Sequence, residues 1–380
     1  MMRHCSVGIP KEIKPEEKRV AGLPEHVQRL RELGVDVLVQ HDAGIASGHS
    51  DADYERAGAE LVETMEEVYA RADLLWKVKE PLPPEYGLLR PDQVIFTYLH
   101  LAPRPRMVEA LLAARCTAIA YEEVTDDQGR RPLLAPMSRI AGAGAIAIAA
   151  QFTQSLYDGV GKCLFTTEGA DPMRVTILGG GTAGRTAARA ALGAGARITV
   201  LESRPEVAHG LRRTFVRACV ELSTEDAIRR LLPETDVLVN CTYWMPGEPH
   251  LVTREMLALM PRGALIVDVA ADPHGAIETS EETTHAQPIR VVDGILHYCV
   301  QNIPALFPRT ASSLLSQATW PYLERMVRDG IATAIREDPM LRRGVSVWRG
   351  KLVGEELGRA LKRESLAPDE LLAEIGTAGE

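Results

Sequence analysis

Short apolar runs alternate with amphipathic stretches along the first third of the chain. Runs rich in β-branched residues predict strands at 6–9, 36–40, 74–78, 94–98 and 117–121. Two stretches with the helical spacing of apolar residues predict helices at 25–33 and 106–114. Because strands that alternate with helices form parallel βαβ units, this part of the chain predicts an α/β domain with a parallel sheet.

A second alternating series begins near Arg174. Its predicted strands lie at 174–178, 197–201, 236–240, 265–269, 290–293 and 296–300. After Pro308 the pattern turns helical again, at 314–328 and 354–362. The tail from Ser365 is acidic, and we expect it to be poorly ordered.

The two series together predict an α/β fold with two Rossmann-like, doubly wound domains and a cleft between them. We expect residues 1–138 and 309–380 to form a substrate domain, and residues 139–308 to form a dinucleotide-binding domain. The first domain is discontinuous in this prediction because the final helices return to it. The periodicity of apolar residues alone does not show whether these final helices pack on the first domain.

An uncharged stretch at 140–157 raises the question of a membrane span. It contains several glutamine, serine and threonine residues and is rich in alanine and glycine, which favours a buried helix over a transmembrane one. The N-terminus reaches Lys11, Glu12 and Lys14 before any long apolar run, so it does not resemble a secretory signal. We therefore expect a cytoplasmic protein without a membrane partner.

Composition narrows the class of protein. The 380 residues are enough for two domains, and 46% hydrophobic with 25% charged residues is typical of a globular protein. The net charge is −9 and no basic run indicates a nucleic-acid partner. The scattered cysteines form no CxxC pair and no cluster with histidine, so we expect neither a disulfide scaffold nor a metal site.

The segment Gly179-Gly180-Gly181-Thr182-Ala183-Gly184 joins a predicted strand to a helix-compatible stretch, which is the context that the GxGxxG motif requires. Gly179 permits the tight turn, Gly181 the approach of a pyrophosphate, and Gly184 close helix–strand packing. Glu202 ends the next strand, where a carboxylate binds ribose hydroxyls and disfavours the 2′-phosphate of NADP. Arg204 could neutralise such a phosphate. The alternative is a glycine-rich turn that closes an empty Rossmann unit.

Polar residues recur at the carboxyl ends of predicted strands, where open parallel sheets bind ligands. They are Arg19, Lys77, Lys79, His100 and Asp272. A guanidinium can grip a carboxylate, an ammonium can polarise a carbonyl, and a histidine can move a proton. The alternatives are a surface arginine, edge-strand lysines, a structural histidine and an aspartate that caps a turn before Pro273.

Several segments resemble the alanine dehydrogenase family, within the superfamily that includes the transhydrogenase alpha subunit. They are Gly8-Ile9-Pro10-Lys11-Glu12 with Arg19-Val20, Leu75-Trp76-Lys77-Val78-Lys79-Glu80-Pro81, Phe96-Thr97-Tyr98-Leu99-His100-Leu101-Ala102, Leu133-Leu134-Ala135-Pro136-Met137-Ser138, Val267-Asp268-Val269-Ala270-Ala271-Asp272, His297-Tyr298 and Pro308-Arg309-Thr310. The segments follow one another in order over nearly the whole chain.

The resemblance implies a role for each matching residue. Arg19 and Lys79 would hold the carboxylate and carbonyl of pyruvate, His100 would act as acid–base, and Asp272 would assist at the imine step. The resemblance further places Ser138 at a cofactor phosphate and Asn302 beside substrate and nicotinamide. Thr182 and Ala183 belong to the glycine-rich segment, and we expect them to bind the cofactor with its glycines.

The resemblance also implies a reaction, the reversible conversion of L-alanine, NAD and water to pyruvate, ammonium and NADH by a homo-oligomer, commonly a hexamer. The chain departs from the family at Arg139, Thr166–Ala170, Tyr243-Trp244, Pro273-His274, Ile303 and Gln317. These departures lie around the expected site, so a close analogue of alanine is a second possible substrate. The other partners expected are a 2-oxo acid and ammonium.

Other functions remain open. One is an opine-type enzyme that condenses an oxo acid with the amino group of another amino acid. A second, from another class, is an NAD(H)-binding module of the transhydrogenase type, and a third is a catalytically silent NAD sensor. His100 and the lack of a membrane segment favour the dehydrogenase.

Overall fold

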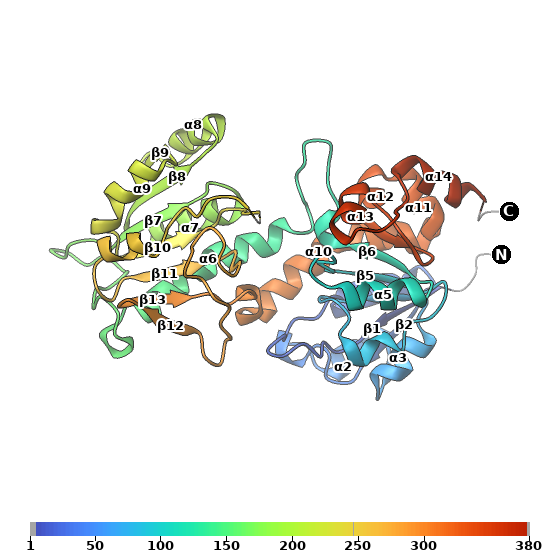
Figure 1. Cartoon of the computed structure of the whole chain (residues 1–380). Helices are drawn as coiled ribbons and strands as arrows, with labels where there is room; N and C mark the ends of the chain where they lie inside the picture. Colours follow the sequence, from blue (N-terminus) through green and yellow to red (C-terminus); the bar gives the residue numbers. More distant parts are fainter. Residues whose placement is uncertain (1–4, 246, 378–380) are drawn as a thin grey trace. The chain divides into compact units, whose positions relative to one another are not determined.

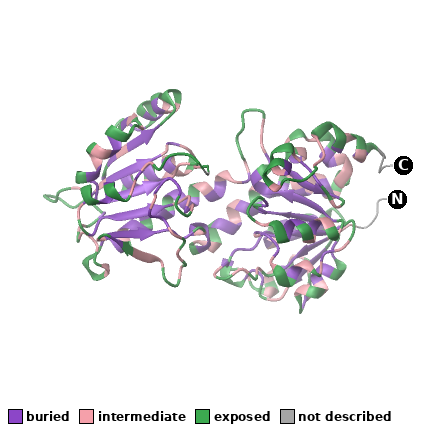
Figure 2. Cartoon of the chain, viewed as in Figure 1, coloured by how far each residue is buried: buried purple, intermediate pink, exposed green. Residues whose placement is uncertain are grey.

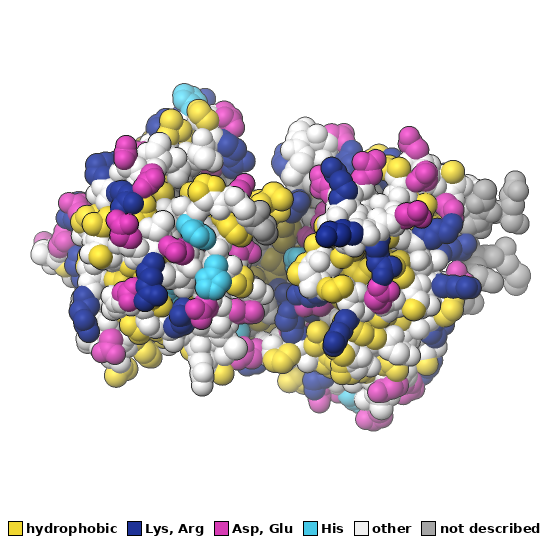
Figure 3. Space-filling view, in the orientation of Figure 1, with side chains coloured by type: hydrophobic (Ala, Val, Ile, Leu, Met, Phe, Trp, Pro, Cys, Tyr) yellow, Lys and Arg dark blue, Asp and Glu magenta, His cyan; other side chains and the backbone are white. Residues whose placement is uncertain are grey.

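The computed structural model describes residues 5–245 and 247–377. The chain divides into two compact units, which are drawn in Figure 1. Unit 1 comprises residues up to Met137 together with those from Phe307 onward, and unit 2 comprises Ser138–Leu306. Unit 1 is therefore discontinuous along the chain. On the face drawn in Figure 3, acidic and basic side chains are interspersed over each unit.

Unit 1 is built on an eight-stranded sheet with the strand order β15-β14-β6-β5-β4-β1-β2-β3. Its strands are β1 (Ser6–Ile9), β2 (Asp36–Gln40), β3 (Glu60–Val62), β4 (Leu74–Trp76), β5 (Val94–Thr97), β6 (Thr117–Ala120), β14 (Val345–Trp348) and β15 (Lys351–Leu352). The first six strands run parallel, while β14 and β15 pair antiparallel at one edge. The strands predicted in this part are confirmed, although β4, β5 and β6 end earlier than expected.

Helices formed by the segments that connect or follow the strands flank this sheet. They are α1 (Pro24–Glu32), α2 (Asp51–Arg56), α3 (Met65–Arg71), α4 (Pro83–Tyr86), α5 (Pro105–Ala113), α10 (Pro308–Asp329), α11 (Ile331–Glu337), α12 (Pro339–Gly344), α13 (Glu355–Leu361) and α14 (Pro368–Thr377). Several begin with proline, whose fixed φ suits the first helical turn. α10 starts six residues before the predicted 314, because Pro308 opens its first turn.

The prediction of a poorly ordered tail is wrong for its described part. α14 occupies Pro368–Thr377, and the side chains of Leu371 and Ile375 are buried. Their spacing of one helical turn gives an otherwise acidic segment an apolar face. Just before the helix, the N–H of Leu366 donates to the carbonyl of Leu352 in β15, which ties the tail to the edge of the sheet.

Unit 2 contains a seven-stranded sheet with the order β12-β13-β11-β10-β7-β8-β9. Its strands are β7 (Arg174–Leu178), β8 (Arg197–Glu202), β9 (Cys219–Leu222), β10 (Val237–Asn240), β11 (Leu265–Asp268), β12 (Ile289–Val292) and β13 (Ile295–Tyr298). Only β12 runs antiparallel to its neighbour. Its helices include α7 (Thr182–Gly193), α8 (Pro205–Thr214) and α9 (Glu225–Leu231). The inner strands of both sheets are almost wholly buried, as Figure 2 shows.

The uncharged stretch at 140–157 lies mostly in α6 (Ala135–Phe152), which ends five residues before the predicted end. A short 3₁₀ turn at Ser155–Tyr157 follows it. α6 packs closely against the start of α7, because a Cβ at Gly142 would collide with the carbonyl oxygen of Ala183. Within the described residues, no helix combines the length and the apolar character that a membrane crossing requires.

Candidate functional site

The glycine turn of unit 2 has the geometry that its sequence predicts. β7 ends at Leu178 and α7 begins at Thr182, so the turn spans Gly179–Gly181. Gly179 has φ +88°, and a Cβ there would lie 2.9 Å from the carbonyl oxygen of Cys241. A Cβ at Gly184 would collide with the carbonyl oxygen of Gly179. Two of the three glycines are therefore required by backbone geometry alone.

Gly181 differs from the other two glycines, since a Cβ there would meet nothing within 4 Å among the described residues. It is the N-cap of α7, and within the described part of the chain no side chain forms a cap hydrogen bond there. The N–H groups of the first turn, at the positive end of the helix dipole, are therefore not capped by a side chain of the described residues. Such a helix start is suited to bind a phosphate.

Ser138 lies one helical turn before Gly142 in α6, and the two residues therefore share a face of the helix. Gly142 is the residue that packs against Ala183 in the glycine turn. Ser138, which is half-buried, thus lies on the face of α6 that meets the turn. Its predicted contact with a cofactor phosphate remains a prediction.

Glu202 is the last residue of β8 and is 3% exposed. Its Oε2 accepts a hydrogen bond from the N–H of Gly180 at 2.8 Å, and its Oε1 accepts from the N–H and Nε of Arg204, both at 3.0 Å. Burial raises the pKa of Glu202, but the hydrogen bonds from Arg204 and Gly180 outweigh it and lower that pKa below its usual range. The carboxylate is therefore ionised and fixed beside the glycine turn.

Asp272 follows β11 in a loop that buried polar groups shape. Asp268, at the end of β11, accepts hydrogen bonds from the N–H of Ala271 at 3.0 Å and from Asn240 Nδ2 at 2.8 Å. Ala271 has φ +51°, which is uncommon for a residue with a side chain. Burial and then Asp268 raise the pKa of Asp272, which is half-buried.

Asn302 lies near this loop, because the side chain of the preceding Gln301 reaches the carbonyl of Ala271 at 3.5 Å. The carbonyl of Asn302 is in turn 3.1 Å from His285 Nε2. Asn302 is half-buried. Unit 2 thus brings the Asp272 and Asn302 segments together at the carboxyl end of its sheet.

Two departures from the family pattern meet in unit 2, although they are distant in the sequence. His250 Nδ1 is 2.8 Å from the carbonyl oxygen of Gly275, and its ring stacks with that of Trp244. A Cβ at Gly275 would lie 3.4 Å from Trp244 Cε3. The loop after β10 therefore packs on the loop that carries Asp272, and its Tyr243 is 81% exposed.

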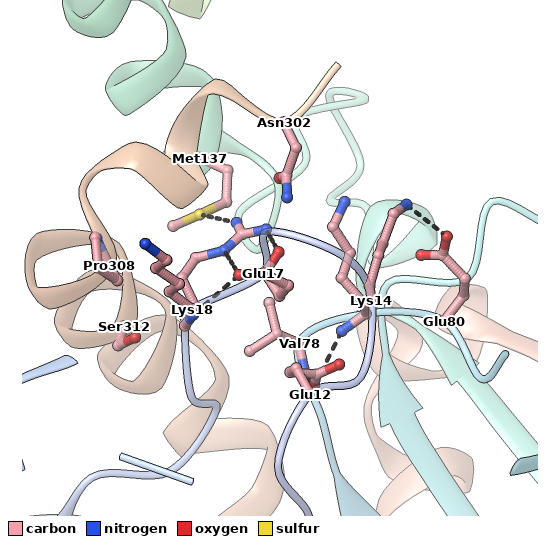
Figure 4. A network of polar contacts seen from close by, with 12 residues as sticks. Glu12, Lys14, Glu17, Lys18, Val78, Glu80, Met137, Asn302, Pro308 and Ser312 are labelled. Carbon is pink, nitrogen blue, oxygen red and sulfur yellow. Dashed lines mark hydrogen bonds and ion pairs between the residues drawn. The ribbon is translucent and has the colours of Figure 1, made fainter. Parts of the chain in front are cut away.

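Arg19 in unit 1 is buried, and its guanidinium is oriented by Glu17. Arg19 Nε donates to Glu17 Oε1 at 2.7 Å, and Nη2 lies 2.5 Å from Oε2, which makes a bidentate ion pair. Nη1 contacts Met137 Sδ at 3.1 Å. Figure 4 shows these groups around the guanidinium. The reading of Arg19 as a solvated surface arginine is therefore wrong.

Lys79 is held through its backbone. Its carbonyl accepts a hydrogen bond from Thr97 Oγ1 at 2.9 Å, and its N–H lies 3.3 Å from Glu12 Oε1. Burial, and then the positive charges of Arg19 and Lys14, lower the pKa of Lys79 to about 8. Lys79 and Arg19 therefore lie within electrostatic reach of each other.

Lys77 does not share this environment, although the sequence grouped it with Lys79 among the residues at predicted strand ends. β4 ends at Trp76, and the Lys77 side chain is fully buried. Its Nζ lies 2.7 Å from Glu85 Oε1 and 3.4 Å from Glu12 Oε2. The edge-strand interpretation is also wrong, because β4 is an inner strand of the sheet. Lys77 neutralises buried carboxylates.

His100 follows β5 and has φ +47°. The N–H groups of Leu99 and His100 donate to Glu122 Oε1 at 3.1 and 2.5 Å, and His100 Nδ1 lies 3.7 Å from the same oxygen. The imidazole stacks with Tyr98 and is 42% exposed. Despite this exposure, the protein atoms around the imidazole displace much of its hydration, and this desolvation and then the charge of Lys79 lower the pKa of His100 to about 4. The imidazole is therefore neutral at neutral pH and can accept a proton.

Three buried carboxylates of unit 1, Glu12, Glu17 and Glu122, were not singled out in the sequence. Each of them fixes a residue that was predicted, namely Lys79, Arg19 and His100 in that order. The available signal was weak. Glu12 and Glu17 stand in a charged loop, and Glu122 directly follows the strand predicted at 117–121, where a carboxylate most often faces solvent.

Comparison with known proteins agrees with this architecture. The family described as alanine dehydrogenase/PNT matches this chain with its N-terminal domain over residues 8–141 and with its C-terminal domain over residues 145–355. An alanine dehydrogenase of Halomonas elongata is 41% identical over 361 residues, which cover 94% of this chain and 97% of the relative. One of Mycobacterium tuberculosis is 40% identical over 370 residues, which cover 97% and 100%.

Solved structures agree with the sequence relatives. An L-alanine dehydrogenase superposes with a TM-score of 0.88 at 37% identity, covering 94% of this chain and 99% of that structure. A transhydrogenase from Sinorhizobium meliloti superposes with a TM-score of 0.77 at 26% identity, covering 92% and 99%. The chain therefore belongs to the alanine dehydrogenase/PNT family.

Proposed function

We propose that this chain is an NAD-dependent dehydrogenase that interconverts L-alanine, or a close analogue, with the corresponding 2-oxo acid and ammonium. The observation that carries the proposal is the grouping of Arg19, Lys79 and His100 in unit 1. Arg19 is buried and forms a bidentate ion pair with Glu17, Lys79 has a lowered pKa, and His100 is neutral. Lys79 interacts electrostatically with both of the others, and the three follow neighbouring strands at their carboxyl ends. Each matches one requirement of a 2-oxo acid: its carboxylate, its carbonyl oxygen and its proton transfers.

The residues of unit 2 fit a nicotinamide dinucleotide. In this proposal the open N-terminus of α7 at Gly181 binds the pyrophosphate, Ser138 contacts a phosphate, and Glu202 accepts hydrogen bonds from the adenosine ribose. When bound, the cofactor supplies the hydride acceptor for oxidation of the amine. Because Glu202 is ionised, it opposes a 2′-phosphate, which favours NAD over NADP.

In oxidation of the amino acid, Arg19 holds the carboxylate and keeps the α-carbon in place. Water adds to the imine to give a carbinolamine. As the carbinolamine then releases ammonia, Lys79 stabilises the developing carbonyl oxygen, and His100 accepts a proton from the hydroxyl group. We assign to the carboxylate of Asp272 the role of favouring the ammonium or imine form of the substrate, and to Asn302 a contact with the substrate. The reverse reaction uses the same groups with the protons moving in the opposite direction.

The test is a screen of purified protein for NADH formation with the common L-amino acids, followed by NADH oxidation with 2-oxo acids and varied amines. We expect turnover with L-alanine or a small apolar analogue, and with free ammonium in the reverse direction. Turnover only with a bulky amine would favour the opine-type reaction instead. Because a transhydrogenase shares the fold, hydride exchange between NADH and an NADP analogue is measured in parallel.

We also expect a homo-oligomer, which light scattering after gel filtration would measure, and a cytoplasmic location. The altered loops around Tyr243, Trp244 and Asp272 are the reason to include analogues of alanine in the screen. These loops pack on each other at the carboxyl end of the unit 2 sheet, where an altered wall changes the preferred side chain of a substrate.

A further inference from the structure

The backbone of His100 is held from both sides by charged side chains. Its φ of +47° lies in the left-handed region, which residues with a side chain adopt rarely. The N–H of His100 donates to Glu122, and its carbonyl accepts a hydrogen bond from Arg104 Nη1 at 2.8 Å. A backbone conformation of this kind persists only where surrounding groups determine it.

Arg104 is itself fixed by a carboxylate. Its Nη2 lies 3.0 Å from Glu80 Oε1, and Lys14 Nζ lies 2.8 Å from the same oxygen. The Glu80 side chain is 2% exposed, so this carboxylate is a rigid anchor. Because Glu80 directly follows Lys79, Arg104 bridges the segment that carries Lys79 and the carbonyl of His100. Arg104 precedes α5 and was not among the predicted site residues.

We propose that Arg104 is a positioning residue for His100 in the reaction proposed above, on which this inference rests. It acts through two hydrogen-bonding edges of one planar group. One edge holds the His100 carbonyl and the other is anchored on Glu80. The bridge keeps the imidazole at a constant position relative to Lys79. Arg104 touches neither substrate nor cofactor in this role.

Arg104 also contributes to the electrostatics of the imidazole. The charged groups that face His100 come from several segments, namely Lys79, Glu80, Arg104, Lys14 and Glu122. After burial, Lys79 lowers the pKa of His100, Glu80 raises it, and Arg104 and Lys14 lower it. Removal of the Arg104 charge therefore raises the pKa of His100. A residue with a structural role only would leave this pKa unchanged.

The experiment compares three variants of the full-length protein, with the substrate found in the screen. Arg104→Gln removes the charge and the bridge, and Arg104→Lys keeps the charge but has no planar fork. Arg106→Gln is the matched control, because Arg106 is exposed in the first turn of α5 and its side chain has no hydrogen bond or ion pair among the described residues. Measurements are kcat and KM between pH 3 and 10, a range that includes the limb that reports His100, together with NADH affinity and thermal melting.

We expect Arg104→Gln to lower kcat about tenfold, because a small misplacement of a reacting group is costly, with KM for the oxo acid and NADH affinity little changed. The limb of the kcat–pH profile that reports His100 moves to higher pH. Arg104→Lys lowers kcat less and leaves that limb in place, and Arg106→Gln behaves as wild type.

Two results would overturn the inference. If wild type is active and Arg104→Gln has the kcat and pH profile of Arg106→Gln, Arg104 does not position His100. The inference also fails if a lower folded fraction fully explains the loss of activity and the limb of the kcat–pH profile does not shift. Wild-type inactivity with every oxo acid and amine is a different outcome, since it removes the proposed function and this inference with it.

Discussion

Replacement of Arg19 tests the geometry of unit 1 in a quantitative way. The Arg19 side chain is 2% exposed and makes two hydrogen bonds to Glu17. Arg19→Lys keeps the charge but can restore only one of them, and a hydrogen bond to a charged group contributes about 1.5–3 kcal/mol. Arg19→Met removes the cation that faces the buried Glu17, which costs about 3–5 kcal/mol. That is a large share of a typical unfolding free energy of about 5–15 kcal/mol.

The same substitutions separate stability from substrate binding. Because a lysine cannot reproduce the planar fork, we expect Arg19→Lys to lower kcat/KM for the oxo acid about tenfold to a hundredfold. NADH affinity should change little, since the glycine turn belongs to unit 2. Glu17→Gln combined with Arg19→Met removes both charges, so it should regain stability without regaining activity.

Urea unfolding followed by tryptophan fluorescence gives the free energy of unfolding of each variant. Steady-state kinetics gives kcat/KM, and an NADH titration gives the cofactor affinity. An Arg19→Lys protein with the wild-type kcat/KM would contradict the carboxylate role. An Arg19→Met protein as stable as wild type would show that the buried ion pair with Glu17 does not stabilise the fold.

Three further predictions concern His100, Lys79 and Glu202. His100→Ala should lower kcat about a hundredfold to ten-thousandfold with thermal melting and NADH affinity preserved, and near-normal kcat would remove His100 from the mechanism. Since the pKa of Lys79 is about 8, its ammonium loses the proton as the pH rises through that value. KM for the oxo acid should therefore rise above pH 8, and a KM that stays constant up to pH 10 argues against contact between Lys79 and the substrate. Glu202 should give NAD(H) a preference of about tenfold or more over NADP(H), about 1.4 kcal/mol, in steady-state kinetics. A preference for NADP(H) would instead assign Arg204 to the phosphate.

The glycine turn was predictable in detail because its requirements are local. Gly179 needs a positive φ, and Gly184 leaves no space for a Cβ beside the backbone of its own turn. The inner parallel strands were predictable for a similar reason, since a strand buried on both faces is a continuous apolar run. The pattern did not reveal the edge strands β3, β9 and β15, nor β14, which pairs antiparallel between β15 and β6.

The polar residues of unit 1 were less predictable because their surroundings come from distant segments. Lys77 and Lys79 have the same side chain and stand two residues apart, yet one neutralises Glu85 in the core and the other lies within electrostatic reach of Arg19. A buried charge requires a partner, and no local pattern shows which residue supplies it. Glu85 is contributed by α4 and Glu12 by the loop after β1.

The sequence by itself therefore determined the class of fold, the glycine turn and the residue types that the chemistry requires, because each is written in local spacing and backbone sterics. Tertiary structure decided which of these residues are held for function. Arg19 is oriented by Glu17, and His100 is held between Glu122 and Arg104, at the meeting of separate loops. The physical reason is that hydrogen bonds and burial depend on the distance in space between groups, which periodicity along the chain does not specify.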